Sequence, residues 1–180
     1  MEHPPNSTED QSPRPVTWCP SGSPDRPEAV VLGVRSGPDG QVVYLDAPMP
    51  AAEALGSIPE GIAPTRVLRF ASHCVAECAQ RVGTECGLVE RIRTAPSGPV
   101  ASSVPQCHLR PRCTWWHQVG VDACRRCPAV TTLNSPDDEL LALVSDPATT
   151  QEQLRDWIAE RAATDPRPPA DRPATAQDPS

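Results

Sequence analysis

The chain has 180 residues, a net charge of −7 and 38% hydrophobic residues, and all 16 of its basic residues are arginine. The absence of lysine excludes Schiff-base chemistry and catalysis by a lysine general base. The acidic balance argues against nonspecific binding of nucleic acid as the main function.

The 24 prolines concentrate at the two ends of the chain. Residues 1–17 and 166–180 hold too little apolar surface to offset the entropy cost of ordering, so we expect both ends to be disordered. A single cysteine-rich domain is predicted over 28–163, with a metal core at 73–128 and helices at 135–163. Its aliphatic core is small, and such cores commonly need a covalent or metal staple.

The first ten residues contain neither a basic segment nor an apolar segment, so no secretory signal is predicted. No apolar run approaches the roughly 20 residues of a membrane helix. We therefore expect a cytoplasmic protein without a membrane partner. In that reducing environment, disulfides are the less expected use of the cysteines.

An α+β fold is indicated by the order of the predicted elements. Two β-rich runs, Ala29–Arg35 and Gln41–Asp46, flank a glycine-containing turn and predict an N-terminal β-hairpin. One helical turn is expected at Ala51–Leu55, and a short strand at Arg66–Phe70.

Several short elements are predicted to carry the cysteines. A helix is expected over Cys74–Val82 and should end at Gly83, whereas Cys86–Arg93 alternates apolar and polar residues like a strand. Two further helical segments are expected at Arg112–Val119 and Val121–Cys127.

Capping signals predict a C-terminal pair of helices. Ser135 should cap a helix at Glu139–Val144, and Thr149 should begin a capping box for Gln151–Ala163. Trp157 shares a face of the second helix with other apolar residues, so we expect it to pack in the core or to dock a partner.

Seven of the eight cysteines and three of the four histidines fall between residues 73 and 127. Metals bind thiolates rather than thiols, so such a cluster needs a metal or an oxidising compartment. The candidate ligands are Cys74, Cys78, Cys86, Cys107, Cys113, Cys124 and Cys127.

The cysteines divide into two candidate sites. The four from Cys107 to Cys127 supply one complete ligand set, which includes a C-x₂-C pair followed by proline, as in ferredoxin-type runs. The first three lack a fourth ligand, for which Cys19, His73, water and substrate are candidates. His117 follows Cys113 by four residues and is the best alternative ligand, whereas His73 and His108 are expected outside the first coordination sphere.

Basic residues surround these cysteines. Between residues 66 and 127 there are nine arginines and four acidic residues, giving +5 in a chain whose total charge is −7. Arginines beside cysteines lower thiol pKa values and balance an anionic metal–sulfur centre.

An iron–sulfur cluster of the [4Fe–4S] type is the predicted cofactor, in one or two copies. Spacings of seven, five and ten residues between successive cysteines suit a cube with separated corners better than a zinc module. Zinc remains the alternative metal. A third hypothesis is that the cysteines bind no metal and either perform thiol–disulfide chemistry or are simply buried. Trp115 and Trp116 are expected to shield the site from water.

The sequence therefore predicts a small metal-stapled iron–sulfur protein. Its expected function is electron transfer, or the holding of a redox-active cluster, for a partner enzyme in a biosynthetic pathway. A zinc-stapled interaction or regulatory module is the rival function. An enzyme whose three-cysteine cluster offers an open iron to its substrate is a third hypothesis.

Overall fold

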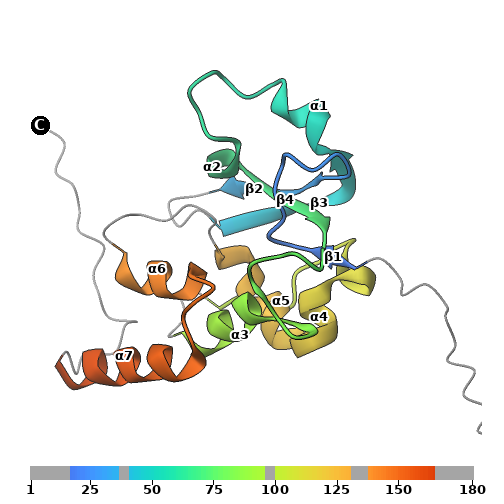
Figure 1. The fold of residues 1–180 in the computed structure, drawn as a ribbon. Helices are drawn as coiled ribbons and strands as arrows, with labels where there is room; N and C mark the ends of the chain where they lie inside the picture. Colours follow the sequence, from blue (N-terminus) through green and yellow to red (C-terminus); the bar gives the residue numbers. More distant parts are fainter. Residues whose placement is uncertain (1–16, 37–40, 96–99, 131–137, 165–180) are drawn as a thin grey trace, which may run out of the picture.

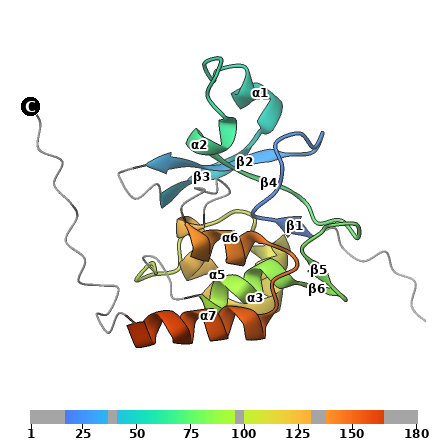
Figure 2. The same ribbon diagram turned by 60° about the vertical axis from the view of Figure 1, so that its left-hand side comes forward.

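The computed structural model describes residues 17–36, 41–95, 100–130 and 138–164, and it has a mixed α+β fold. A small antiparallel sheet lies on one side of the molecule and a group of short helices on the other (Figures 1 and 2). The predicted α+β class is confirmed. The predictions of disorder concern the two ends, which lie almost entirely outside the described residues.

The main sheet has the strand order β1-β4-β2-β3, with antiparallel neighbours throughout. Apolar residues are buried on both of its faces, which explains the continuous apolar run in β2. Val31 and its partner Phe70 pack toward helix α1, whereas Leu32 packs toward the cysteine region. The strands are β1 (Trp18–Cys19), β2 (Val30–Ser36), β3 (Gln41–Pro50) and β4 (Leu68–His73).

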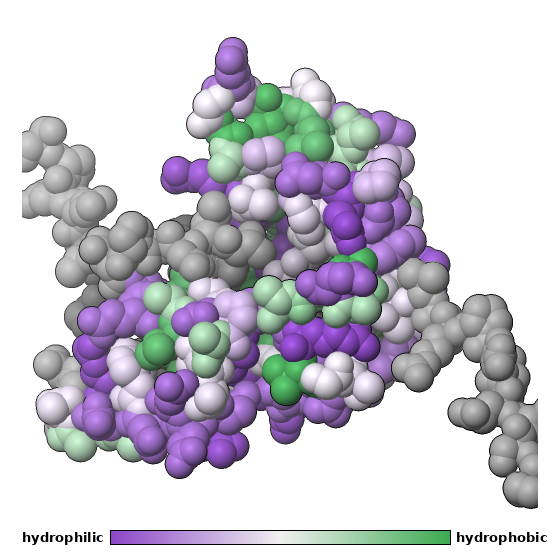
Figure 3. Space-filling view, viewed as in Figure 1, coloured by the Kyte–Doolittle hydropathy of each residue, from purple (hydrophilic) through white to green (hydrophobic). Residues whose placement is uncertain are grey.

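Two short helices, α1 (Ala51–Leu55) and α2 (Pro64–Val67), connect β3 to β4. Figure 3 shows that apolar side chains gather on the surface of this part of the molecule. Ile62, between the two helices, and Met49, near the end of β3, are both about two-fifths exposed. Residues 66 and 67 are helical, so the strand predicted from Arg66 begins only at Leu68 and runs on to His73.

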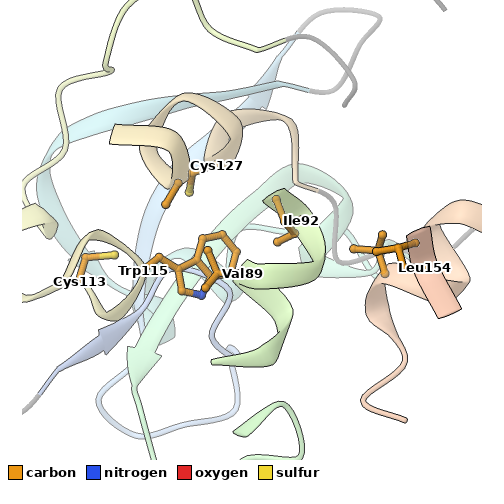
Figure 4. Packing of buried hydrophobic residues seen from close by; sticks show 8 residues of the cluster. Val89, Ile92, Cys113, Trp115, Cys127 and Leu154 are labelled. Atoms are coloured by element: carbon orange, nitrogen blue, oxygen red, sulfur yellow. The ribbon is translucent and has the colours of Figure 1, made fainter. Parts of the chain in front are cut away.

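The helical side is built around Trp115, which is 1% exposed. Figure 4 shows its ring between Cys113 and Val89, in the cluster that also contains Ile92 and Leu154. The helices are α3 (Gly87–Thr94), α4 (Thr114–Val119), α5 (Val121–Arg126), α6 (Glu139–Ser145) and α7 (Gln151–Thr164). Two 3₁₀ turns lie at Arg110–Arg112 and Cys127–Ala129. No described helix has the length and apolar character needed to cross a membrane.

The helix predicted at Cys74–Val82 is wrong. The chain instead turns irregularly and then forms a two-stranded ribbon from β5 (Arg81–Val82) and β6 (Glu85–Cys86). A helix here would have no apolar stripe to bury, and Val82 is 64% exposed. Gly83 does adopt the left-handed conformation, with φ of 62°, but in the turn of this ribbon.

The strand predicted at Cys86–Arg93 is also wrong, because residues from Gly87 onward form α3. Val89 and Ile92 lie three positions apart and both are buried in the core around Trp115. On a helix these positions share one face, and this tertiary burial outweighs the alternating pattern.

The two C-terminal helices exist, but different residues cap them. Asp138 caps α6 by accepting a hydrogen bond from the Leu141 backbone N–H at 2.9 Å, whereas the predicted cap, Ser135, lies outside the described residues. The capping box of α7 begins one residue later than predicted. Thr150 and Gln153 exchange the two hydrogen bonds, at 3.2 and 2.8 Å.

Candidate metal centre

Four cysteines line a large cavity of about 1010 Å³ beside β1 and β6. We call Cys19, Cys74, Cys78 and Cys86 the first cysteine group. Cys19 ends β1, Cys74 directly follows β4, Cys78 lies in the irregular turn and Cys86 ends β6. Of the candidates for a fourth ligand, Cys19 and His73 both line this cavity.

Strand pairing positions the first group. Cys19 pairs with Ser72, and the Cys74 N–H bonds to the Thr17 carbonyl at 2.9 Å, so β1 and β4 bring the two cysteines together. The loop after Cys19 presses against β4 at Gly22. A Cβ atom there would lie 2.2 Å from the Ser72 backbone nitrogen, so this close approach requires glycine.

The other four cysteines line a small cavity of about 20 Å³ together with Tyr44 and Trp115. We call Cys107, Cys113, Cys124 and Cys127 the second cysteine group. Cys113 immediately precedes α4, Cys124 lies in α5, and Cys127 begins the following 3₁₀ turn. The predicted division of the cysteines thus matches their distribution between two cavities.

Burial keeps several of these thiols protonated in the absence of a metal. It raises the pKa of Cys19 and of Cys113 from the ordinary 9.0 to about 12. Neighbouring cysteines within each group raise these pKa values further, Cys86 acting on Cys19 and Cys127 acting on Cys113. Burial also raises the pKa of Cys107, which lies near Cys127 and Cys124.

Backbone N–H groups that hydrogen-bond the sulfurs oppose this rise in the thiol pKa values. The N–H of Ser21 lowers the pKa of Cys19, and the N–H of Val89 lowers that of Cys86. In the second group, the N–H of Leu109 acts on Cys107 in the same way. Such donors stabilise a negatively charged sulfur, and hydrogen bonds to sulfur tune iron–sulfur centres.

Two arginines are buried beside the cysteines without a carboxylate within ion-pairing distance among the described residues. Arg69 is 1% exposed and donates to the carbonyls of Pro20 and Val130, while its Nη2 has no partner. Its charge lowers the pKa of Cys19. Arg91 is 3% exposed, donates to Val144 and Gln80, and interacts electrostatically with Cys86 and with Asp146. A buried cation needs a compensating anion, which ligated thiolates would supply.

The spacing of the sulfurs tests which metal these residues fit. Over the described parts of the chain, no three Cys, His, Asp or Glu side chains are arranged to hold a single metal ion. The small cavity has room for about one water-sized sphere. Four sulfurs at about 2.3 Å from one zinc ion would leave no such room. In the described residues, the second group therefore does not form the tight tetrahedron of a single-ion site.

His73 and His117 both line the large cavity, whereas His108 lines neither cavity. His117 Nε2 lies 2.9 Å from the Pro111 carbonyl oxygen. His117 lines the large cavity, whereas Cys113 lines the small cavity. The expected shared helical face is therefore wrong, because α4 begins after Cys113. His73 packs edge-on against Trp18, and His108 Nδ1 lies 3.3 Å from the Leu45 carbonyl.

Sequence reasoning missed Arg69 and Tyr44. Burial raises the pKa of Tyr44, and its proximity and hydrogen bond to Cys127 add to that rise. Both residues lie on strands of the sheet; Tyr44 is far from every cysteine in sequence, whereas Arg69 precedes Cys74 by five residues. Tyr44 is the single tyrosine of the chain and lies within an apolar run, and this was the one sequence signal that could have pointed to it.

No protein-family model, no curated protein and no solved structure matches this chain. No two of its eight cysteines are joined by a disulfide.

Proposed function

We propose that the chain is an iron–sulfur protein in which each cysteine group holds one [4Fe–4S] cluster. The observation that carries this proposal is the grouping of all eight cysteines into two sets of four around separate cavities. Four thiolates are the ligand set of such a cluster. A cube spreads its ligands more widely than one ion does, and no three of the described Cys, His, Asp or Glu side chains converge on a single ion.

The charge distribution supports the same proposal. A [4Fe–4S] cluster with four thiolates is an anionic unit, and Arg69 and Arg91 are buried beside the first group. Arg110 hydrogen-bonds Cys124 of the second group. These arginines would stabilise ligated thiolates and raise the reduction potential of the clusters.

The cluster would serve electron transfer to a partner enzyme of a biosynthetic pathway. Folding around it would make the cluster a structural staple as well, because metal binding then contributes directly to stability. The hydrophobic clusters beside the cysteines are small, which agrees with a fold that needs a metal centre for stability.

The test is chemical analysis of the full chain purified without air. The proposal expects iron and acid-labile sulfide in equal amounts, about eight of each per chain, and broad visible absorption that bleaches on reduction. A colourless protein that contains about two zinc ions per chain and no sulfide would instead establish the zinc-stapled module.

A further inference from the structure

Three arginines from three different helices line a cavity of about 280 Å³ on the helical side of the molecule. Arg93 lies in the last turn of α3, Arg126 ends α5, and Arg155 lies in the second turn of α7. Helix α3 packs against both α5 and α7, which brings the three side chains to one space (Figure 2). We call this space the arginine cavity. It shares no lining residue with either cavity of the cysteine groups.

Two of these arginines have no compensating charge in the described part of the chain. Arg93 is paired, because its Nη1 lies 2.8 Å from Glu90 Oε2. Neither Arg126 nor Arg155 lies within ion-pairing distance of a described carboxylate. The Nη1 atom of Arg126 is also buried without a described hydrogen-bond acceptor. A buried donor without an acceptor is unfavourable, and an anionic ligand at this guanidinium would provide the missing compensation.

The charges and the helix end at the arginine cavity favour an anion. Against the three arginines stand two lining carboxylates, those of Glu90 and Asp122. Glu90 is already engaged by Arg93 and by the amide of Gln118, so Asp122 is the lining carboxylate that would oppose an anion. Helix α7 begins at Gln151, which lines the cavity, and the positive end of a helix dipole attracts negative charge.

The size and the lining of the arginine cavity define the class of anion. Its volume of about 280 Å³ lies at the lower end of the range for small-molecule sites, about 300–1,000 Å³, so the ligand is small. Every described residue that lines it is polar or charged, so it offers neither an aromatic ring to stack on a nucleobase nor apolar surface for an acyl chain. Guanidinium groups that approach from different helices suit a phosphoryl group, whose oxygens point in several directions.

We propose that the arginine cavity binds the phosphoryl group of a small soluble molecule, which Arg126 and Arg155 hold by charge-assisted hydrogen bonds. Arg93 stays paired with Glu90 and borders the site. The bound anion neutralises charges that α5 and α7 contribute, so it joins two helices that lie apart in the sequence. The site is separate from the cysteine groups, and its ligand therefore binds whichever metal the cysteines hold.

Calorimetric titration of the full chain tests the class of ligand. Inorganic phosphate, glycerol phosphate and acetate are titrated separately in a chloride buffer of constant ionic strength. We expect saturable binding of both phosphates, with one molecule per chain, and no saturable binding of acetate. Absence of phosphate binding, or equal affinity for acetate, would overturn the proposal. Binding to vesicles that contain phosphatidic acid, without binding of either soluble phosphate, would overturn the assignment to a soluble ligand.

Variants of the same chain test the location of the site. Arg126→Gln and Arg155→Gln should each weaken phosphate binding about tenfold, because each removes a charge-assisted hydrogen bond. Arg125→Gln is the matched control, since Arg125 lies on the same helix, is exposed and does not line the cavity. Asp122→Asn should strengthen binding by removing the opposing carboxylate, a gain that loss of folding cannot produce. Equal weakening in Arg125→Gln and Arg126→Gln, or no gain in Asp122→Asn, would contradict binding in the arginine cavity.

Discussion

Trp18 forms a parallel β-bridge with Cys113, although the two residues lie in distant parts of the sequence. The same tryptophan pairs with His73 across β1 and β4. One short strand thus joins the chain next to Cys74 to the chain at Cys113, and it carries Cys19 itself. The second cysteine group lies within residues 107–127, but the first cannot form from one local segment, so metal binding there and folding of the sheet should be coupled.

Replacement of a single cysteine should remove one cluster. We expect Cys19→Ser and Cys127→Ser each to lose about half of the iron, since each cluster needs four thiolate ligands. Thr84→Ser is the control, because Thr84 lines the large cavity without a sulfur. Iron analysis and thermal unfolding of the three variants provide the measurement. Full iron content in Cys19→Ser would remove that residue from the first group.

Arg69→Gln should affect the loaded and the metal-free protein in opposite ways. With ligated thiolates present, loss of the buried cation leaves anionic charge uncompensated and should cost about 3 kcal/mol. Without metal, the thiols are neutral and the substitution should be neutral or stabilising. Chemical denaturation of both forms gives the two free energies, with the exposed Arg66→Gln as the control. Equal destabilisation of both forms would exclude the charge-balancing role.

The metal-free protein should lose stability at alkaline pH. Burial raises the folded-state pKa of Cys19 and Cys113 from 9.0 to about 12. The folded state therefore holds these thiol protons more tightly than the unfolded state does. The resulting contribution to the free energy of unfolding is fully present below pH 9.0. It is lost as the pH rises from 9.0 toward 12.

Bound metal should change this pH profile, because ligated cysteines carry no proton to lose. We expect the loaded protein to keep its stability through the alkaline range and to release metal on acidification. Denaturation midpoints over a pH series, with and without metal, make the comparison. Identical alkaline profiles for the two forms would contradict ligation by Cys19 and Cys113.

Leu154, rather than Trp157, should anchor α7. Leu154 is 0% exposed in the core around Trp115, whereas Trp157 is half-buried and packs against Arg161 at 4.9 Å. Leu154→Ala should cost about 3 kcal/mol of unfolding free energy. Trp157→Ala should cost about 1 kcal/mol, the value of an exposed cation–π contact. A larger loss from Trp157→Ala in urea denaturation would reverse this assignment.

Local sequence signals predicted the α+β class and the grouping of the second four cysteines, because turn residues and short spacings act over a few positions. They failed where long-range burial decides the structure. Val89 and Ile92 make α3 a helix only because Trp115 packs on them. Likewise, Cys19 joins the first group through the pairing of β1 with β4, which no spacing along the chain reveals.

Anomalous diffraction from crystals grown without air, measured at the iron and zinc absorption edges, tests the central claim most directly. Our account predicts strong iron signal in two places, one in the cavity lined by the first cysteine group and one in that lined by the second. Zinc signal alone at these positions, or sulfur–sulfur bonds within either group, would contradict it.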